Sequence, residues 1–193
     1  MIKKQITYFE KAGKHNTNDL IKVLKSRLNE EDIRFVVVAS STGETALKLW
    51  KEIKSLDVKL VVVSLHAGFR GGDSLRMSNK IKEELLEDGV MVYIGSHILS
   101  GLGRSITDRF GGTTFPEMIA HTLRRFSGHG IKVAVEVAIM AADAGFVPTN
   151  ETIISIGGSK GGADTAITLQ ASHMNNFFDL EIKEIIAKPL SSE

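Results

Sequence analysis

Short apolar runs that alternate with helical segments constrain the fold of this chain more than any other feature. Arg34–Ala39, Leu60–Val63 and Val90–Ile94 are typical of strands buried on both faces, because their apolar residues follow one another without polar alternation. Segments with apolar residues at helical spacing precede the first run and separate the others. This order predicts parallel strands joined by right-handed crossovers.

The second half of the chain predicts helices followed by a hairpin. Residues 96–150 are interpreted as helical, including Lys132–Met140, which alternates like a strand but also fits an apolar helical stripe. Thr152–Ile156 and Thr165–Leu169 are expected to be strands joined by a glycine-rich turn, and Ile182–Ala187 to be a last strand. We found neither an internal repeat nor a low-complexity linker, so one domain over residues 1–193 is expected.

These expectations combine into one fold class. We predict an α/β protein with a three-layer α/β/α sandwich, in which a mainly parallel mixed sheet has an antiparallel edge formed by the second glycine-rich hairpin. In such sheets, ligands bind where loops leave the carboxyl ends of the strands. The loops at 40–42, 64–72, 95–101 and 157–165 are therefore expected to open on one side.

Composition narrows the classes of partner and chemistry. The 193 residues carry a net charge of +1 without a basic block, so the electrostatic signature of a nucleic-acid-binding protein is missing. The absence of cysteine excludes disulfides and thiolate chemistry and is compatible with a cytoplasmic protein. No segment reaches the roughly 20 apolar residues of a membrane helix, and no signal peptide is evident. The histidine spacings indicate no metal site.

The loop after the first apolar run has the composition of a phosphate cradle. Ser40, Ser41, Thr42, Gly43 and Thr45 offer hydroxyls and backbone N–H groups at the start of a helix, where the helix dipole favours an anion. A capping box, with Ser41 as the N-cap and a glutamate three positions later, is the alternative interpretation. Capping accounts for fewer of these residues than ligand binding does, so we predict ligand binding here.

A second loop of similar composition joins the two strands of the predicted hairpin. It has four glycines within six positions, which permits close backbone approach to a ligand. A mobile hairpin connection is the alternative. The expected contributors to a ligand site are Gly158, Ser159, Gly161, Gly162, Asp164 and Thr165.

Polar side chains elsewhere are candidates for the rest of the ligand. His66 and His97 follow strands on the predicted ligand face, where each could bind a ring carbonyl or phosphate, act as an acid or base, or lie in solvent. Asn175 and Asn176 offer amides that can read the edge of a heterocycle, although a polar turn explains them equally well.

Several stretches together resemble a known family. Phe35–Thr45 resembles the strand–loop–helix opening of the C-terminal α/β domain of pyruvate kinase, where such a loop holds a phosphate of an allosteric effector, and the glycine-rich hairpin is similar to the last loop of that domain. The whole chain resembles more closely a family of stand-alone, mostly archaeal, pyruvate-kinase C-terminal-domain-like proteins of uncharacterised function. The stretches that carry this resemblance are Ala39–Leu47, His97–Gly101, Phe110–Gly112, Ala120–Arg124, Gly161–Ala166 and Asn175–Asp179.

The resemblance implies a ligand-binding fold without pyruvate kinase activity, because the catalytic barrel is missing. It also implies flavin mononucleotide (FMN), with which members of the family have been linked. The first hypothesis is therefore a binding protein for a phosphorylated cofactor, expected to be FMN. A second is an enzyme, either a flavin-dependent oxidoreductase or a phosphosugar-acting enzyme that uses His66 or His97 as acid or base. A third is a regulatory module that senses a sugar phosphate. The oligomeric state stays open, a homo-oligomer included.

Overall fold

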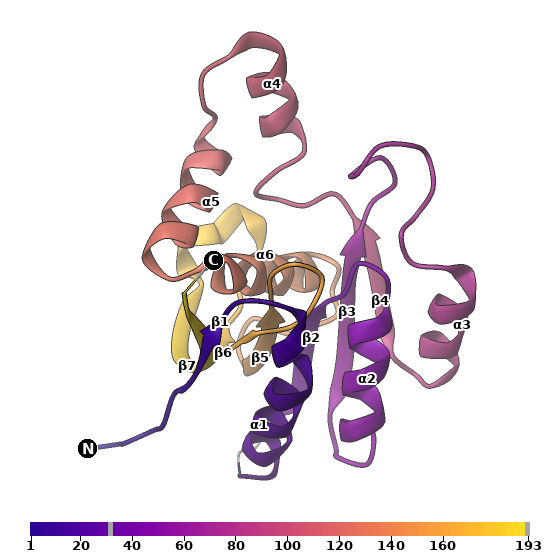
Figure 1. Cartoon of the computed structure of the whole chain (residues 1–193), viewed down its shortest axis with the longest axis vertical. Coiled ribbons are helices and arrows are strands. Elements are labelled where there is room, and N and C mark those ends of the chain that lie inside the picture. The colour runs from indigo at the N-terminus through magenta and orange to yellow at the C-terminus, as the bar shows by residue number, and fades with distance from the viewer. Residues whose placement is uncertain (31–32, 192–193) are drawn as a thin grey trace.

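The protein forms a seven-stranded sheet with helices on both faces, as the computed structural model shows (Figure 1). The structure describes residues 1–30 and 33–191. The strands are β1 (Thr7–Lys11), β2 (Phe35–Ala39), β3 (Lys59–Leu65), β4 (Met91–Gly95), β5 (Thr152–Gly157), β6 (Thr165–Gln170) and β7 (Glu181–Ser191). The helices are α1 (Thr17–Glu30), α2 (Glu44–Ile53), α3 (Asn79–Glu87), α4 (Leu102–Phe110), α5 (Phe115–Phe126) and α6 (His129–Asp143), with short 3₁₀ segments η1 (Lys14–Asn16) and η2 (Met174–Asp179).

The sheet order is β1-β7-β6-β5-β2-β3-β4, and every strand except β6 runs in the same direction. The predicted fold class, a mainly parallel mixed sheet in an α/β/α sandwich, is confirmed. The hairpin of β5 and β6 supplies the antiparallel pairing as expected. Beyond it the sheet continues through β7, which is antiparallel to β6, and β1, which is parallel to β7.

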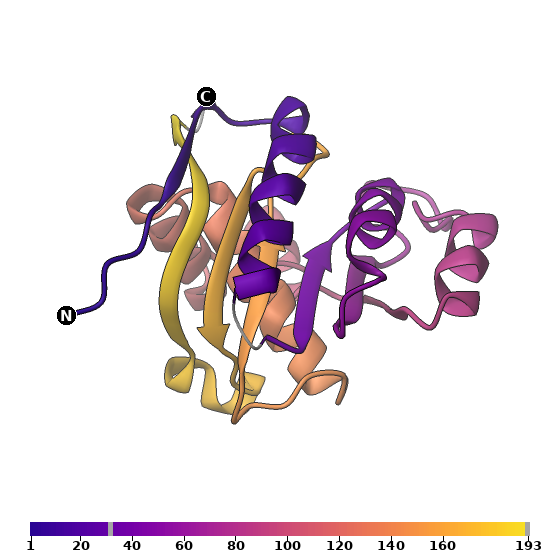
Figure 2. The ribbon, with the colours of Figure 1, turned by 90° about the horizontal axis from the view of Figure 1, so that it is seen from below.

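Two apolar cores hold the three layers together. One lies between the sheet and helices α1, α2 and α3, and the other lies between the opposite face and α6 (Figure 2). Successive residues of β2 divide between them, since Val36 and Val38 join the first core while Val37 joins the second. This division explains the continuous apolar runs, because a strand covered on both faces has no solvent-facing side.

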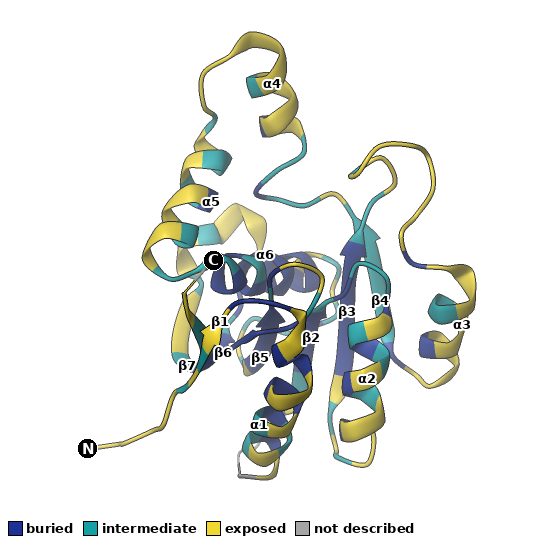
Figure 3. Cartoon of the chain, in the orientation of Figure 1, coloured by how far each residue is buried: buried dark blue, intermediate teal, exposed yellow. Residues whose placement is uncertain are grey.

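The segment Lys132–Met140 is helical, as predicted, and lies within α6. Nearly the whole of α6 is buried, whereas α4 stands apart from the sheet and is mostly exposed (Figure 3). Burial on every side of α6 explains why its apolar residues extend beyond the predicted stripe, since a helix enclosed by protein needs no polar face.

Two local expectations are wrong or incomplete. Ser41 does not cap α2; the N-cap is Gly43, which adopts a left-handed conformation with φ 88°. A Cβ at Gly43 would collide with the side chain of Ile81, so only glycine fits the turn. The strand β1 was not predicted, because its residues are largely exposed and it is an edge strand that pairs only with β7.

Candidate functional site

The carboxyl ends of the parallel strands surround one cavity of about 640 Å³. The loops after β2, β3, β4 and β5 all contribute to its lining, together with α4, α5 and α6. The convergence of the two glycine-and-hydroxyl loops on one cavity agrees with the sequence argument. Parallel strands produce it, because their carboxyl ends meet at the same edge of the sheet.

One side of the cavity is made by the two loops predicted from the sequence. We call it the loop wall, and it consists of Ser40, Ser41, Thr42, Thr45, Gly158, Gly161 and Gly162. Ser40 is buried, and its Oγ accepts a hydrogen bond from the backbone N–H of Ala46 at 3.3 Å, which satisfies a donor in the first turn of α2. The side chains of Ser41 and Thr42 are partly exposed at the start of α2, where the helix dipole favours an anion.

On the opposite side of the cavity, His97 alone was among the predicted site residues. We call this side the helix wall, and it consists of His97, Ser100, Arg104, Arg124, Lys132 and Glu136. Its centre is a buried network in which Lys132 Nζ lies 2.6 Å from Glu136 Oε2, and the same oxygen lies 3.0 Å from His97 Nδ1. The second carboxylate oxygen of Glu136 accepts the backbone N–H of Leu99 at 2.9 Å. Side-chain exposure is only 5% for Lys132 and 2% for Glu136.

The network keeps Glu136 ionised. Burial by itself would raise the pKa of this carboxyl, but the hydrogen bond to His97 and the charge of Lys132 outweigh burial and lower the pKa to about 2. Burial also lowers the pKa of Lys132, and the carboxylate of Glu136 opposes that effect. Because an ionised carboxylate only accepts hydrogen bonds, His97 Nδ1 must carry a proton, and its Nε2 has no hydrogen-bond partner among the described residues.

The cavity lining is strongly cationic. The positively charged side chains are Arg70, Arg76, Arg104, Arg124, Lys132 and Lys160. Among the lining residues of the described chain, Glu136 is the one carboxylate, and Lys132 already balances its charge. An excess of cations in a partly enclosed space attracts anionic ligands.

His129 adds a neutral group beside these charges. Burial, followed by the charges of Arg124 and Lys132, lowers the pKa of His129. The Nε–H of Arg124 points at His129 Nδ1 at 3.3 Å, which agrees with an unprotonated nitrogen at that position. A neutral His129 leaves the remaining guanidinium donors of Arg124 as the local source of positive charge.

Four predicted site residues are structural instead. Asp164 is fully buried, and its carboxylate accepts hydrogen bonds from the Gly13 N–H at 2.9 Å and the Thr165 hydroxyl at 2.8 Å. Thr165 and Ser159 are likewise buried, and Gly43 forms the turn described above. None of the four lines the cavity. The side chains of Asp164 and Thr165 face inward, where their hydrogen bonds join the glycine loop to Gly13.

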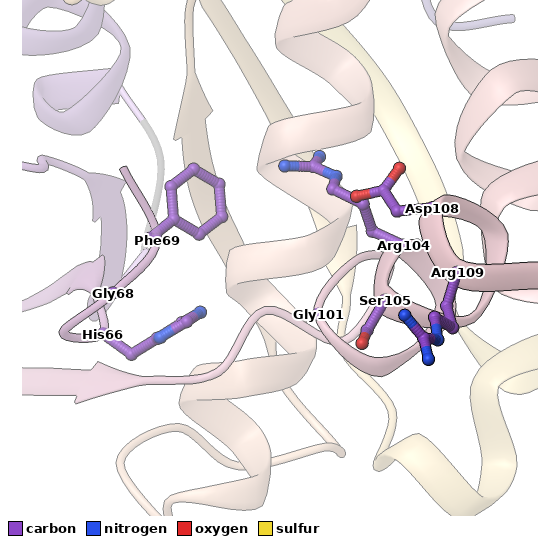
Figure 4. Close-up of a pocket in the computed structure, with 8 residues that line it drawn as sticks. All are labelled: His66, Gly68, Phe69, Gly101, Arg104, Ser105, Asp108 and Arg109. Carbon is purple, nitrogen blue, oxygen red and sulfur yellow. The ribbon is translucent and has the colours of Figure 1, made fainter. Parts of the chain in front are cut away.

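His66 lies in an adjoining pocket of about 460 Å³ and is not among the residues that line the main cavity. His66 and Phe69 approach from the loop after β3, and Arg104 from α4 lies on the other side (Figure 4). His66 Nδ1 lies 2.6 Å from the carbonyl oxygen of Ala67, so one ring nitrogen is engaged locally. His66 and His97, which were predicted as separate candidates, are linked through Phe69, whose ring centroid lies 5.5 Å from that of each histidine.

Asn175 and Asn176 lie at the opposite end of the sheet from the cavity and do not line it. They belong to η2, which follows the end of β6, whereas the glycine loop precedes the start of that strand. Asn176 Nδ2 donates to Asp179 Oδ2 at 3.2 Å. The antiparallel direction of β6 causes the separation, because it carries the chain away from the ligand edge.

The sequence did contain one signal for the helix wall. Lys132 and Glu136 are charged residues four positions apart within an otherwise apolar helix, a spacing that places them on one face. Burial of such a pair requires mutual neutralisation, which is typical of a functional site or a specific packing contact. Arg104 and Arg124 carried no such signal, since arginine is common on helix surfaces.

No protein-family model matches the chain. In the part of the chain that the structure describes, no helix is both long and apolar enough to cross a membrane. The same residues include no cluster of three or more side chains suited to hold a metal ion.

Proposed function

We propose that this protein binds a phosphorylated small molecule in the cavity between the loop wall and the helix wall. The observation that carries the proposal is the charge of the lining, in which the single carboxylate, Glu136, is paired with Lys132 and five further cationic side chains remain. Hydroxyls and glycine backbone lie on the facing side of the same space. This combination is the chemistry that recognises phosphate.

The phosphate is assigned to the loop wall. Ser41, Thr42 and Thr45 lie at the first turn of α2, where backbone N–H groups have no helical acceptors. Gly158, Gly161 and Gly162 allow the ligand to approach the facing backbone closely. The cations Arg70, Arg76 and Lys160 lie on loops that line the same cavity and supply the countercharge.

FMN is the ligand that the family resemblance implies, and the lining is compatible with it. The volume of about 640 Å³ lies within the range of roughly 300–1,000 Å³ usual for small-molecule sites. Val63, Leu65, Phe69 and Val133 offer apolar surface to a planar ring, and His97 offers an unpartnered Nε2 to its polar edge. FMN, when bound, would supply electron or hydride transfer.

The test compares FMN with riboflavin, which lacks only the phosphate. Flavin fluorescence is titrated with the purified chain, and the visible spectrum of the fresh protein is recorded. We expect FMN to bind at least about tenfold more tightly than riboflavin, because charge-assisted hydrogen bonds to phosphate are among the stronger ones. A colourless protein that leaves FMN fluorescence unchanged contradicts FMN as the ligand.

A test that does not depend on flavin covers the wider proposal. Inorganic phosphate and glycerol 3-phosphate are titrated by calorimetry into the wild type and into Thr42→Val, which removes one hydroxyl of the loop wall. Weaker binding by the variant supports the assignment. Failure of every phosphorylated probe to bind the wild type refutes the proposed function.

The pair of His97 and Glu136 favours an enzyme as a second candidate. A carboxylate at 3.0 Å holds Nδ1 of His97 and orients the ring, which is how a general base is positioned. Such an enzyme would move a proton on a bound phosphosugar. Deuterium incorporation from D₂O into dihydroxyacetone phosphate, followed by NMR and lost in His97→Ala, would support it; no incorporation by the wild type counts against this reaction.

A further inference from the structure

We infer that the helix wall contains a second anion-binding subsite, so that the physiological ligand carries another anionic group, a carboxylate or a second phosphate, besides the phosphate on the loop wall. The subsite consists of His97, Ser100, Arg104 and Arg124. The inference rests on the phosphate site of the proposed function, but it does not require FMN as the ligand.

Two buried polar atoms without partners mark the subsite. His97 Nε2 and Ser100 Oγ are both inaccessible to solvent, and neither forms a hydrogen bond within the described chain. Both residues line the cavity, and both lie on the segment between β4 and α4. Buried polar groups in folded proteins nearly always have partners, so two neighbouring exceptions at a cavity indicate a missing ligand group.

The orientation of His97 is specified by the network behind it. Glu136 binds Nδ1 at 3.0 Å and also holds the following loop through the Leu99 N–H at 2.9 Å. Turning the imidazole ring over would break the contact between Nδ1 and Glu136, so the side chain is held in this orientation. The His97 side chain is 9% exposed, so the atom is held in place before any ligand arrives.

The two arginines of the subsite supply positive charge, and the charge of Arg104 also acts on the carboxylate of Glu117 outside the cavity. Neither Arg104 nor Arg124 forms an ion pair with a carboxylate among the residues the structure describes. The guanidinium of Arg104 lies 5.7 Å from the centre of the Phe69 ring, and Arg124 is directed to the neutral His129. Their planar donors match the geometry of a carboxylate or phosphate.

A single phosphate does not account for both walls. The loop wall derives from the segments after β2 and β5, whereas the subsite derives from α4, α5 and the segment after β4. One phosphate bound to the hydroxyls at the start of α2 would leave the buried atoms of His97 and Ser100 without partners. A ligand with a second anionic group would accept hydrogen bonds from the Ser100 hydroxyl and the guanidinium groups of the subsite, and a hydroxyl beside that group could donate to His97 Nε2.

The experiment compares glycerol 3-phosphate with 3-phosphoglycerate, which has the same carbon number and one additional carboxylate. Both are titrated by calorimetry into the wild type, Arg124→Gln and the control Arg125→Gln, which alters the neighbouring exposed arginine of α5 that does not line the cavity. We expect the wild type and Arg125→Gln to bind 3-phosphoglycerate roughly tenfold or more tightly than glycerol 3-phosphate. The free energy of one charge-assisted hydrogen bond corresponds to about this ratio of dissociation constants.

In Arg124→Gln this preference should fall to less than about threefold, while the affinity for glycerol 3-phosphate stays within about twofold of the wild type. Ser100→Ala is a smaller change that tests the subsite even where Arg124→Gln does not fold. It should reduce the preference for 3-phosphoglycerate several-fold.

Three results would overturn the inference. Equal affinity of the wild type for the two ligands refutes the second subsite and leaves the phosphate site intact. A full preference in both Arg124→Gln and Ser100→Ala refutes the residues assigned to it. Absence of binding by either ligand refutes the proposed function, and the inference with it.

Discussion

The two walls of the cavity differ in how they are built, although both face the same space. The loop wall uses hydroxyls and glycine backbone that follow directly from the ends of β2 and β5. The helix wall combines long charged side chains of α4, α5 and α6 with His97 and Ser100 from the segment after β4, and its contact between His97 and Glu136 joins residues 39 positions apart in the chain. Local turns therefore make one wall, and tertiary packing makes the other.

This difference has an energetic consequence. The groups of the loop wall are small and sit where α2 begins, so removal of an exposed hydroxyl costs the fold little. Lys132 and Glu136 are buried charges that depend on each other, so loss of one leaves the other uncompensated. We expect changes in the buried pair of Lys132 and Glu136 to affect stability, and changes in the partly exposed hydroxyls of the loop wall to affect ligand affinity.

The largest effect is expected for Lys132→Met, which keeps a long side chain but removes the charge that faces Glu136. The free energy of unfolding, measured by urea denaturation, should fall by about 3 kcal/mol, because a buried carboxylate loses its countercharge. The double variant Lys132→Met/Glu136→Gln should recover at least half of that loss, and Lys48→Met on the exposed face of α2 serves as the control. A loss below about 1 kcal/mol in the single variant would contradict the ion pair.

As the pH falls, the contribution of Glu136 to the free energy of unfolding should be lost over a defined range. The pKa of Glu136 is about 2 in the folded protein against an ordinary value of 4.5, so its contribution to stability is complete above pH 4.5 and is lost as the pH falls toward 2. The loss amounts to about 3 kcal/mol at most, from about 1.4 kcal/mol per unit of pKa. Unfolding free energies of the wild type and Glu136→Gln should converge across this range; parallel curves would disprove the assignment.

An intermediate effect is expected in the glycine loop. A Cβ at Gly158 would collide with the carbonyl oxygen of Gly162, so Gly158→Ala should cost roughly 1–3 kcal/mol of stability and weaken phosphate binding. At Gly161 the space is open and only the φ of 83° opposes a side chain, so Gly161→Ala should cost about 1 kcal/mol. Thermal unfolding and phosphate titration of the two variants measure the difference, and the reverse order would show that the loop rearranges.

The smallest effects are expected at the adjacent residues Ser40 and Ser41, of which the first should affect stability and the second phosphate binding. Ser40→Ala removes the acceptor for the Ala46 N–H and should lower stability by about 1 kcal/mol. Ser41→Ala should change stability by less than about 0.5 kcal/mol but weaken phosphate binding about fivefold. Urea denaturation and calorimetry of both variants test this, and a stability loss confined to Ser41→Ala would reverse the roles given to them.

The sequence was a good guide to the fold and to half of the site. Apolar runs predicted the buried strands, and the parallel order predicted that the segments at 40–42 and 157–165 would converge on one edge. It was a poor guide to which polar side chains face the cavity. Asp164 and Ser41 look alike as candidates, yet one is fully buried and binds the Gly13 N–H while the other lines the cavity.

The sequence alone determined the layered α/β architecture and the edge of the sheet at which a ligand would bind, because hydrophobic periodicity and chain connectivity are local properties that restrict topology. Only the tertiary structure decided the charge and polarity of the cavity. Those depend on contacts such as that between His97 and Glu136, which form when α6 packs against the sheet. Burial strengthens the electrostatic interaction in such a contact, because it removes the water that would otherwise solvate each charge.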